Sequence, residues 1–234
     1  MQERSFDVPR YLSVLPLFND LNPEELKHLA EGCVLRRLAR SDMVFRMGDP
    51  CGEFHVVVTG QVKLFVLSPA GQEKVVELLS AGQSFAEAIM FTDRPYILSA
   101  QTLTDTLLLS VSKRAVFAEI ERDHRFALRM LAGLARRMHG LVHDVEAYAL
   151  HSGLKRVIGF LLRDQTLEGC EPSEVRTVSL PVSKATIASL LSLTPEYFSR
   201  VLHDLESRGL IKIDRRDIRI IDANRLTAYQ LEAA

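Results

Sequence analysis

The stretch from residue 182 to residue 210 restricts the fold more than any other part of the sequence. It contains two short amphipathic segments, residues 183–193 and 195–208, with almost no chain between them. Thr194 has the side chain of an N-cap residue for the second segment, and Gly209 follows it as a stop signal. The pattern predicts two helices joined by a very short turn.

A short hairpin follows the two helices, with residues 211–213 and 218–221 as its strands. This order of helix, turn, helix and β wing is typical of DNA-binding domains in which the second helix enters the major groove. The exposed start of that helix carries Glu196, Ser199 and Arg200, which we expect to read bases. Arginine can donate two hydrogen bonds to guanine, and glutamate can accept one from the cytosine amine. The alternative for Glu196 and Arg200 is a surface ion pair between positions i and i+4.

Residues around this unit offer hydroxyl, imidazole or cationic groups that suit the phosphates of double-stranded DNA. The formal net charge of the chain is only −1, from 29 basic and 30 acidic residues. This balance excludes a histone-like protein but does not exclude a local basic patch. The expected contacts to the DNA backbone are Ser183, Lys184, Thr194, His203, Lys212 and Arg216.

Upstream, from residue 34 to about residue 111, short runs rich in Val, Phe and Leu alternate with turn signals. Strands of this length are typical of an all-β sandwich or barrel. The Ser-Pro-Ala-Gly-Gln sequence at 68–72 predicts a hairpin turn, and Asn-Pro-Glu-Glu at 22–25 predicts the start of a helix. Glycines recur at intervals of 12, 11 and 11 residues, at Gly48, Gly60, Gly71 and Gly82.

Residues 113–149 have the pattern of one long amphipathic helix. Its apolar positions step by four and three residues through three heptads, which is the repeat of a coiled coil. The repeat predicts a parallel homodimer, and the alternative is a helix that packs on its own domain. The dimer seam would consist of Ala127, Leu131, Leu134, Met138, Leu141, Val145 and Tyr148.

Several classes of protein are excluded by what the sequence lacks. It has no run of about 18 apolar residues and no apolar signal core, so we expect a cytoplasmic protein without a membrane span. Cys33, Cys51 and Cys170 lie far apart and form no disulfide framework. Phosphate-loop, HExxH and GxSxG motifs are missing, as are the paired histidines and carboxylate of cupin-type metal enzymes. We therefore expect that the protein is not an enzyme.

Taken together, these features resemble the Crp–Fnr transcription regulators over about residues 12–225. The resemblance rests on the glycine-punctuated β domain, the Gly-Gln-Ser-Phe-Ala-Glu segment at 82–87, the long helix and the winged helix-turn-helix. It implies an α+β protein. Residues 1–112 would form a β-roll sensor domain similar to a cyclic-nucleotide-binding jelly roll, residues 113–150 the dimerisation helix, and residues 151–234 the DNA-binding domain.

Glu196, Ser199 and Arg200 match the ExxSR pattern of the Fnr-like branch. That branch is associated with palindromes similar to TTGAT-N4-ATCAA, so the resemblance implies that these residues read the TTGA half-site. Pro195 stands where the cAMP receptor protein has arginine, which argues against the operator of that protein. On a promoter, the homodimer is expected to recruit RNA polymerase. A ligand bound to the sensor domain is expected to alter the hinge near residues 148–154, between the long helix and the DNA-binding domain.

The effector site implied by the resemblance departs from that of the cyclic-nucleotide-binding members. Those members hold the ribose with Gly-Glu and the phosphate with Arg-Ser, and the equivalent pairs here are Ala86-Glu87 and Leu98-Ser99. Loss of the arginine removes the bidentate clamp for a cyclic phosphate, so cAMP is not expected. The first 32 residues contain no cysteine, so an Fnr-type iron–sulfur cluster is not expected either. The expected pocket residues are Phe85, Ala86, Glu87, Leu98, Ser99, Leu131 and Leu134.

Residues 71–74, 84–91 and 137–139 are most similar to the Dnr-type regulators of denitrification. Those proteins are thought to sense nitric oxide through haem, so the resemblance implies a haem b cofactor and control of nitrogen-oxide respiration or stress genes. Histidine is a usual haem ligand, and the leading candidate is His139. Alternatives are another small-molecule effector, or control by expression or cysteine oxidation. Further ligand candidates are His28, His55, His143 and His151.

Overall fold

The computed structural model describes residues 6–15, 18, 21–162, 176–179, 182–215 and 217–232. Within these ranges the side chains are described except at 136–137, 140–141, 143–144, 146–150 and 176–179. The chain divides into two units, Met1–Gly140 and Leu141–Ala234. None of the described helices combines the length and the apolar character that a membrane crossing requires.

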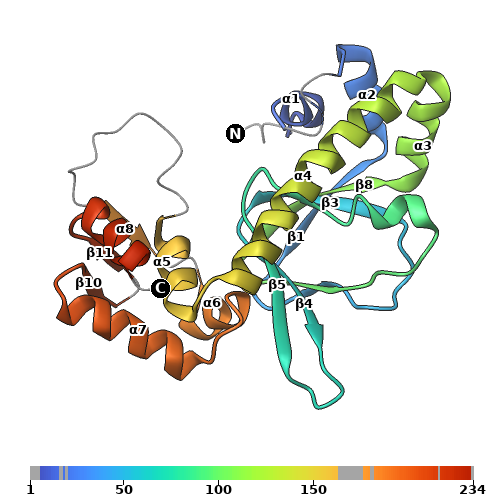
Figure 1. Ribbon diagram of the computed structural model, residues 1–234. Helices are drawn as coiled ribbons and strands as arrows, with labels where there is room; N and C mark the ends of the chain where they lie inside the picture. Colours follow the sequence, from blue (N-terminus) through green and yellow to red (C-terminus); the bar gives the residue numbers. More distant parts are fainter. Residues whose placement is uncertain are drawn as a thin grey trace, which may run out of the picture. The chain divides into compact units, whose positions relative to one another are not determined.

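Two four-stranded antiparallel sheets form the β domain of the first unit (Figure 1). Their strand orders are β1-β8-β3-β6 and β2-β7-β4-β5. The sheets share one apolar cluster, to which Val57 on β3 and Leu64 on β4 both belong. This arrangement confirms the predicted β-roll. The strands are β1 (Cys33–Leu38), β2 (Met43–Phe45), β3 (Glu53–Thr59), β4 (Val62–Leu67), β5 (Glu73–Leu79), β6 (Ser84–Phe85), β7 (Ser99–Thr102) and β8 (Thr106–Ser112).

The hairpin between β4 and β5 turns where the sequence predicts it. The backbone N–H of Gly71 donates to the carbonyl of Ser68 at 2.8 Å, and that of Ser68 donates to the carbonyl of Gln72 at 2.9 Å. Gly71 has a φ of 79°, in the left-handed region that side-chain-bearing residues rarely adopt. The glycine is therefore what allows this tight connection.

Helices pack against the other face of the β1-β8-β3-β6 sheet. Side chains alternate between the faces of a strand, so Phe54 and Val56 on β3 point away from Val57. They join a second apolar cluster with Leu12, Leu29 and other residues of the helices. The helical elements of this unit are α1 (Val8–Ser13), α2 (Pro23–Glu31), the 3-10 helix η1 (Ile89–Thr92), α3 (Lys113–Arg122) and α4 (His124–Leu150).

The start of α2 has the predicted cap. The Asn22 side-chain oxygen accepts hydrogen bonds from the backbone N–H groups of Glu24 and Glu25, each at 3.0 Å. The Glu25 carboxylate in turn accepts one from the Asn22 backbone N–H at 2.8 Å. Such a reciprocal capping box satisfies donors that a helix leaves without partners in its first turn.

The prediction of one unbroken helix over residues 113–149 is wrong, because α3 and α4 separate at Asp123. This residue has extended backbone angles, φ −139° and ψ 104°. Its carboxylate accepts a hydrogen bond from the Arg125 backbone N–H at 2.9 Å, which caps the start of α4. A heptad pattern that begins at residue 127 carries no information about a break four residues earlier.

The longer helix, α4, has two apolar faces. Phe126 and Met130 are buried in the second cluster of the first unit. Away from them, apolar side chains lie exposed at steps of three or four residues, and some reach 66% exposure. Leu131, Met138 and Val145 of the predicted seam are among these exposed residues, Ala127 and Leu134 are half-buried, and Leu141 and Tyr148 lie outside the described side chains. The other exposed members are Leu128, Ala135 and Val142.

The second unit contains the predicted helix-turn-helix and wing. The first of the two helices ends at Leu190 rather than residue 193, because Ser192 takes a left-handed φ of 56°. A third strand, β9, pairs with β11 to give the sheet order β10-β11-β9 and was not predicted, nor was α8. The elements are α5 (Gly153–Leu162), β9 (Arg176–Ser179), α6 (Lys184–Leu190), α7 (Pro195–Ser207), β10 (Ile211–Asp214), β11 (Asp217–Ile220) and α8 (Ala223–Glu232).

Candidate nucleic-acid interface and sensor cavity

The second helix of the motif, α7, presents a polar N-terminal face over a buried apolar one. The Thr194 hydroxyl accepts a hydrogen bond from the Tyr197 backbone N–H at 3.2 Å, so Thr194 is the predicted N-cap. Glu196 and Arg200 are exposed and Ser199 is half-buried. The helical spacing of Val201, Leu202 and Leu205 predicts a buried face, and these residues are buried together with Phe198.

The two charged side chains on this face do not pair with each other. Among the described side chains, no ion pair joins Glu196 to Arg200. Arg200 instead places its guanidinium carbon 5.5 Å from the centroid of the Tyr197 ring. A guanidinium stacked on a ring keeps its N–H groups available at the edge, which suits recognition of a base.

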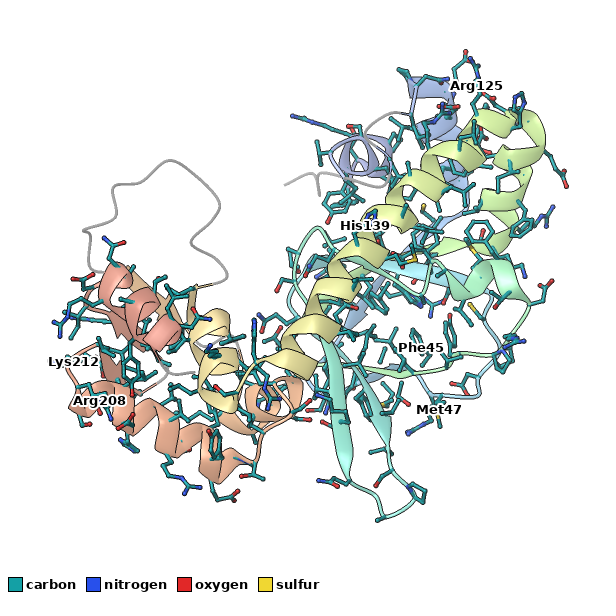
Figure 2. All side chains as sticks on the ribbon, viewed as in Figure 1. Phe45, Met47, Arg125, His139, Arg208 and Lys212 are labelled. Atoms are coloured by element: carbon teal, nitrogen blue, oxygen red, sulfur yellow. The ribbon has the colours of Figure 1, made fainter. Side chains whose placement is uncertain are left out.

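The expected phosphate contacts surround α7. The Ser183 hydroxyl accepts a hydrogen bond from the Thr186 backbone N–H at 3.1 Å, which caps α6. Lys212 is exposed on β10 of the wing (Figure 2), whereas Lys184 is half-buried. His203 is exposed, with its Nδ1 3.7 Å from a carboxylate oxygen of Glu206. Arg216 lies outside the described residues.

In the sensor domain, most of the predicted effector residues are buried or hydrogen-bonded to other residues of the same domain. Phe85 is fully buried in the cluster between the sheets, and Ala86 has a left-handed φ of 68°. Glu87 is only 4% exposed and accepts a hydrogen bond from the Ser84 hydroxyl at 3.1 Å. The segment thus forms a tight turn whose carboxylate is held inside the protein.

The two residues at the position of the phosphate clamp, Leu98 and Ser99, also make contacts within the protein. The Ser99 hydroxyl accepts a hydrogen bond from the Met47 backbone N–H at 3.0 Å. Leu98 is half-buried against the cluster between the sheets. Leu131 and Leu134, on α4, belong to neither apolar cluster. The predicted residues are therefore brought together only in part, in the group formed by Phe85, Ala86 and Leu98.

A cavity of about 350 Å³ opens elsewhere on the sensor domain. Its walls combine three aromatic rings with polar groups: the rings of Phe45 (Figure 2) and Tyr96 stack with centroids 3.7 Å apart, and the centroid of the His55 ring lies 5.7 Å from that of Phe45. The volume is at the lower end of the range for small-molecule sites. The lining residues are Val44, Phe45, Asp49, Pro50, Gly52, Glu53, His55 and Tyr96.

The histidine in this cavity is held neutral. His55 is 1% exposed, and its Nδ1 lies 2.9 Å from the Ser110 hydroxyl oxygen. Burial, assisted by the charge of Arg36, lowers the pKa of His55 to about 3. From the sequence, His55 is one of several candidate haem ligands, and it is not predicted to be a buried neutral histidine beside a cavity. The alternation of β3 was the available signal, since position 55 shares a face with the inward-pointing Val57.

Because of this low pKa, we expect acid to destabilise the protein through His55. The unfolded imidazole titrates near pH 6.5, so below that pH the unfolded state binds a proton that the folded state does not bind until about pH 3. The stabilising contribution is complete above pH 6.5 and decreases by about 2 kcal/mol between pH 7 and pH 5. Urea unfolding at both pH values should show this loss in wild type and not in His55→Gln.

The exposed His203 provides the control for that comparison. His203→Gln should retain the wild-type dependence of unfolding free energy on pH. If His55→Gln and wild type lose equal stability between the two pH values, His55 is not the buried neutral group described here.

The remaining histidines and the cysteines differ from His55. His28, His139 and His151 are accessible, and His143 lies outside the described side chains. Burial raises the pKa of the Cys33 thiol to about 12 and also raises that of Cys51, which keeps both thiols protonated and poorly nucleophilic. Among the described residues, no three His, Cys, Asp or Glu side chains are grouped for a metal ion. Cys170 lies outside the described residues.

Comparison with known proteins assigns both units. Residues 35–123 match the cyclic nucleotide-binding domain, and residues 155–229 match the Crp-like helix-turn-helix domain. The cyclic AMP receptor protein of Thermus thermophilus is 29% identical over 89% of this chain and 93% of its own length. The CRP-like cAMP-activated global transcriptional regulator of Mycobacterium tuberculosis is 23% identical over 90% and 94%.

One solved structure has a higher sequence identity to this chain than these two relatives. The crystal structure of DNR from Pseudomonas aeruginosa is 34% identical, covers 97% of this chain and 100% of that chain, and has a TM-score of 0.54. FixK2 from Bradyrhizobium japonicum, 21% identical with a TM-score of 0.72 over 84% of this chain and 96% of its own, has the same fold. The chain therefore belongs to the Crp–Fnr family of transcription regulators, with a DNA-binding helix-turn-helix domain, and is not an enzyme.

Proposed function

We propose that the protein binds, as a homodimer, a palindrome of the TTGAT-N4-ATCAA type and reads it through Glu196, Ser199 and Arg200. The observation that supports this most directly is the exposed face of α7, where Glu196 and Arg200 do not neutralise each other. Their hydrogen-bonding groups are thus available for cytosine and guanine edges. In the dimer the two recognition helices would lie one DNA turn apart, about 34–36 Å.

The test uses the full chain and two fluorescent duplexes, one with the palindrome and one with its half-sites scrambled. A specific regulator binds its site about 10³–10⁷ times more tightly than other DNA at the same salt concentration. Anisotropy titrations should give a preference in this range with two chains per duplex. Equal affinity for the two duplexes would refute the proposed site.

The exposed apolar residues of α4 support the dimer. An isolated helix gains no stability from leaving Leu131, Met138 and Val145 in water, whereas a second copy of the helix would bury them. Because α4 ends at Leu150 and α5 begins at Gly153, a change in the sensor would reach the DNA-binding domain through this short connection. Acting in the cytoplasm, the bound dimer would recruit RNA polymerase.

We further propose haem b as the cofactor and nitric oxide as the signal. A haem site needs a side chain that can hold the iron and apolar surface for the ring. His139 fits this requirement, because it is exposed on α4 (Figure 2) and lies within about one helical turn of the exposed Ala135 and Val142, which are outside the predicted dimer seam. When bound, haem supplies an iron coordination position that takes nitric oxide. The role of His139 would be to hold the iron, and that of its apolar neighbours to exclude water from the ring.

For this cofactor, we expect His139→Ala to abolish saturable haem binding. An anaerobic absorption titration of wild type should saturate at one haem per chain with a shifted Soret band, and the variant should show only weak, non-saturating uptake. His203→Ala, which removes an exposed histidine of the second unit, is the matched control. A wild-type spectrum in His139→Ala would exclude this residue as the ligand, and lack of saturation in wild type would exclude the cofactor.

The cavity at His55 favours a second candidate, a regulator that responds to a small molecule other than haem. Its lining combines the rings of Phe45 and Tyr96 with the carboxylates of Asp49 and Glu53, which suits a small uncharged aromatic molecule that can donate a hydrogen bond. Indole, which is uncharged and aromatic, is a suitable probe.

We expect Gly52→Leu to block this cavity. Gly52 lines the cavity, and a Cβ there would meet no atom within 4 Å, so a larger side chain finds open space at this position. Calorimetry should show indole binding to wild type and to Gly52→Ala, and about tenfold weaker binding to Gly52→Leu, the factor that about 1.4 kcal/mol produces. Absence of indole binding in wild type would contradict a site for small uncharged aromatic molecules.

A further inference from the structure

The ring of Tyr197 is close to both the start of α5 and the side chain of Arg200. A Cβ added to Gly153 would lie 2.6 Å from Tyr197 Cε1 and 3.0 Å from a methyl carbon of Leu193. Real Cβ atoms do not approach other atoms so closely, so the first residue of α5 must be in direct contact with this ring. Arg200 stacks on the same ring at 5.5 Å. One side chain thus contacts both the helix that follows the hinge and the arginine expected to read a base.

The same turn of α5 is also joined to the turn of the helix-turn-helix. The Arg156 guanidinium donates to the carbonyl oxygens of Leu191 and Ser192, the second at 3.4 Å. Ser192 has the left-handed φ of 56° that ends the first helix of the motif. Further along α5, the side chains of Val157, Ile158 and Leu161 are buried. The first turn of α5, the turn of the motif and the N-terminus of α7 therefore form one packed unit.

We propose that Tyr197 is a positioning residue that fixes the orientation of Arg200 and makes it depend on the position of α5. A long arginine side chain loses rotamer freedom when it binds a base, and stacking on a ring lowers that cost before DNA arrives. A shift of Gly153 would push the ring and so turn the guanidinium. This inference rests on the proposed function, in which Arg200 recognises a base.

A purely structural Tyr197 predicts a different result from a positioning Tyr197. Loss of packing alone would lower the melting temperature and weaken binding to every DNA sequence. Loss of positioning lowers only the preference for the correct base, since contacts to phosphates carry no sequence information. The informative quantity is therefore the ratio of affinities for two duplexes that differ at the base that Arg200 reads.

The experiment uses the full chain and a pair of palindromic duplexes, with the guanine of each TTGAT half-site kept or changed to adenine. Tyr197→Leu removes the ring, and Tyr197→Phe keeps the ring without the hydroxyl. The affinity ratio should fall about two- to fivefold per half-site in Tyr197→Leu, the factor expected for an exposed cation–π contact, and stay unchanged in Tyr197→Phe. Binding to unrelated DNA should be unchanged in both variants.

Gly153→Ala provides the second measurement, and as a single variant it does not depend on the stability of Tyr197→Leu. Its methyl group should displace the ring and lower the affinity ratio in wild type. In the Tyr197→Leu background it should have little further effect, so the two changes should be non-additive. Additive effects, an unchanged ratio in Tyr197→Leu, or an equal loss on unrelated DNA would each overturn the proposal. An unchanged ratio in Arg200→Ala would instead refute base reading by Arg200, whatever the Tyr197 variants show.

Discussion

Arg200→Ala should reduce the affinity for the TTGAT palindrome at least about 30-fold. Each bidentate contact between arginine and guanine contributes about 1–3 kcal/mol, and a dimer on a palindrome loses two of them. Affinity for unrelated DNA should change little, because that binding depends on phosphates. Anisotropy titrations of wild type and variant on specific and unrelated duplexes, at one salt concentration, measure both effects.

Arg208→Ala is the matched control for this prediction, because it removes the same charge at the other end of the helix. Arg208 pairs with Asp204 at 3.0 Å and stacks on Tyr229 at 5.0 Å, so it already has partners within its own unit. It should retain most of the preference for the palindrome. If the two variants lose the same preference, net charge rather than base contact explains the effect of Arg200.

Phe54→Ala should destabilise the protein by about 3–5 kcal/mol, the usual cost of removing a buried phenylalanine. Phe54 is fully buried, and its ring lies 6.0 Å from that of Phe18 in the cluster between the sheet and the helices. The smaller side chain leaves a cavity that β3 and the helices cannot close without moving. Urea unfolding followed by circular dichroism gives the difference in unfolding free energy.

The comparison for Phe54 is Phe91→Ala, which makes the same chemical change at an exposed site. Phe91 is 36% exposed and contacts Phe117 with centroids 5.7 Å apart. We expect Phe91→Ala to cost about 1–2 kcal/mol, because about a third of the side chain stays in water in the folded state. Similar losses in both variants would show that Phe54 does not stabilise the cluster as its burial indicates.

The sequence by itself determined the features that depend on neighbouring residues. The capping box at Asn22, the turn at Gly71 and the cap at Thr194 each involve residues no more than four positions apart. The buried face of α7 likewise follows from helical spacing at Val201, Leu202 and Leu205. Such signals are readable in the chain because the interacting groups are near each other in it.

Tertiary structure decided what depends on contacts between distant segments. Pairing with β11 makes residues 176–179 a strand, although their own sequence is too short to predict one. Packing between the sheets buries His55 beside a cavity and lowers its pKa, so its imidazole is neutral. The Ser99 hydroxyl accepts a hydrogen bond from the backbone N–H of Met47, a residue far from it in the sequence. The contact of Gly153 with Tyr197 joins residues 44 positions apart, and periodicity within either helix contains no trace of it. Desolvation and close contact arise only when the chain has folded, so no local pattern can encode them.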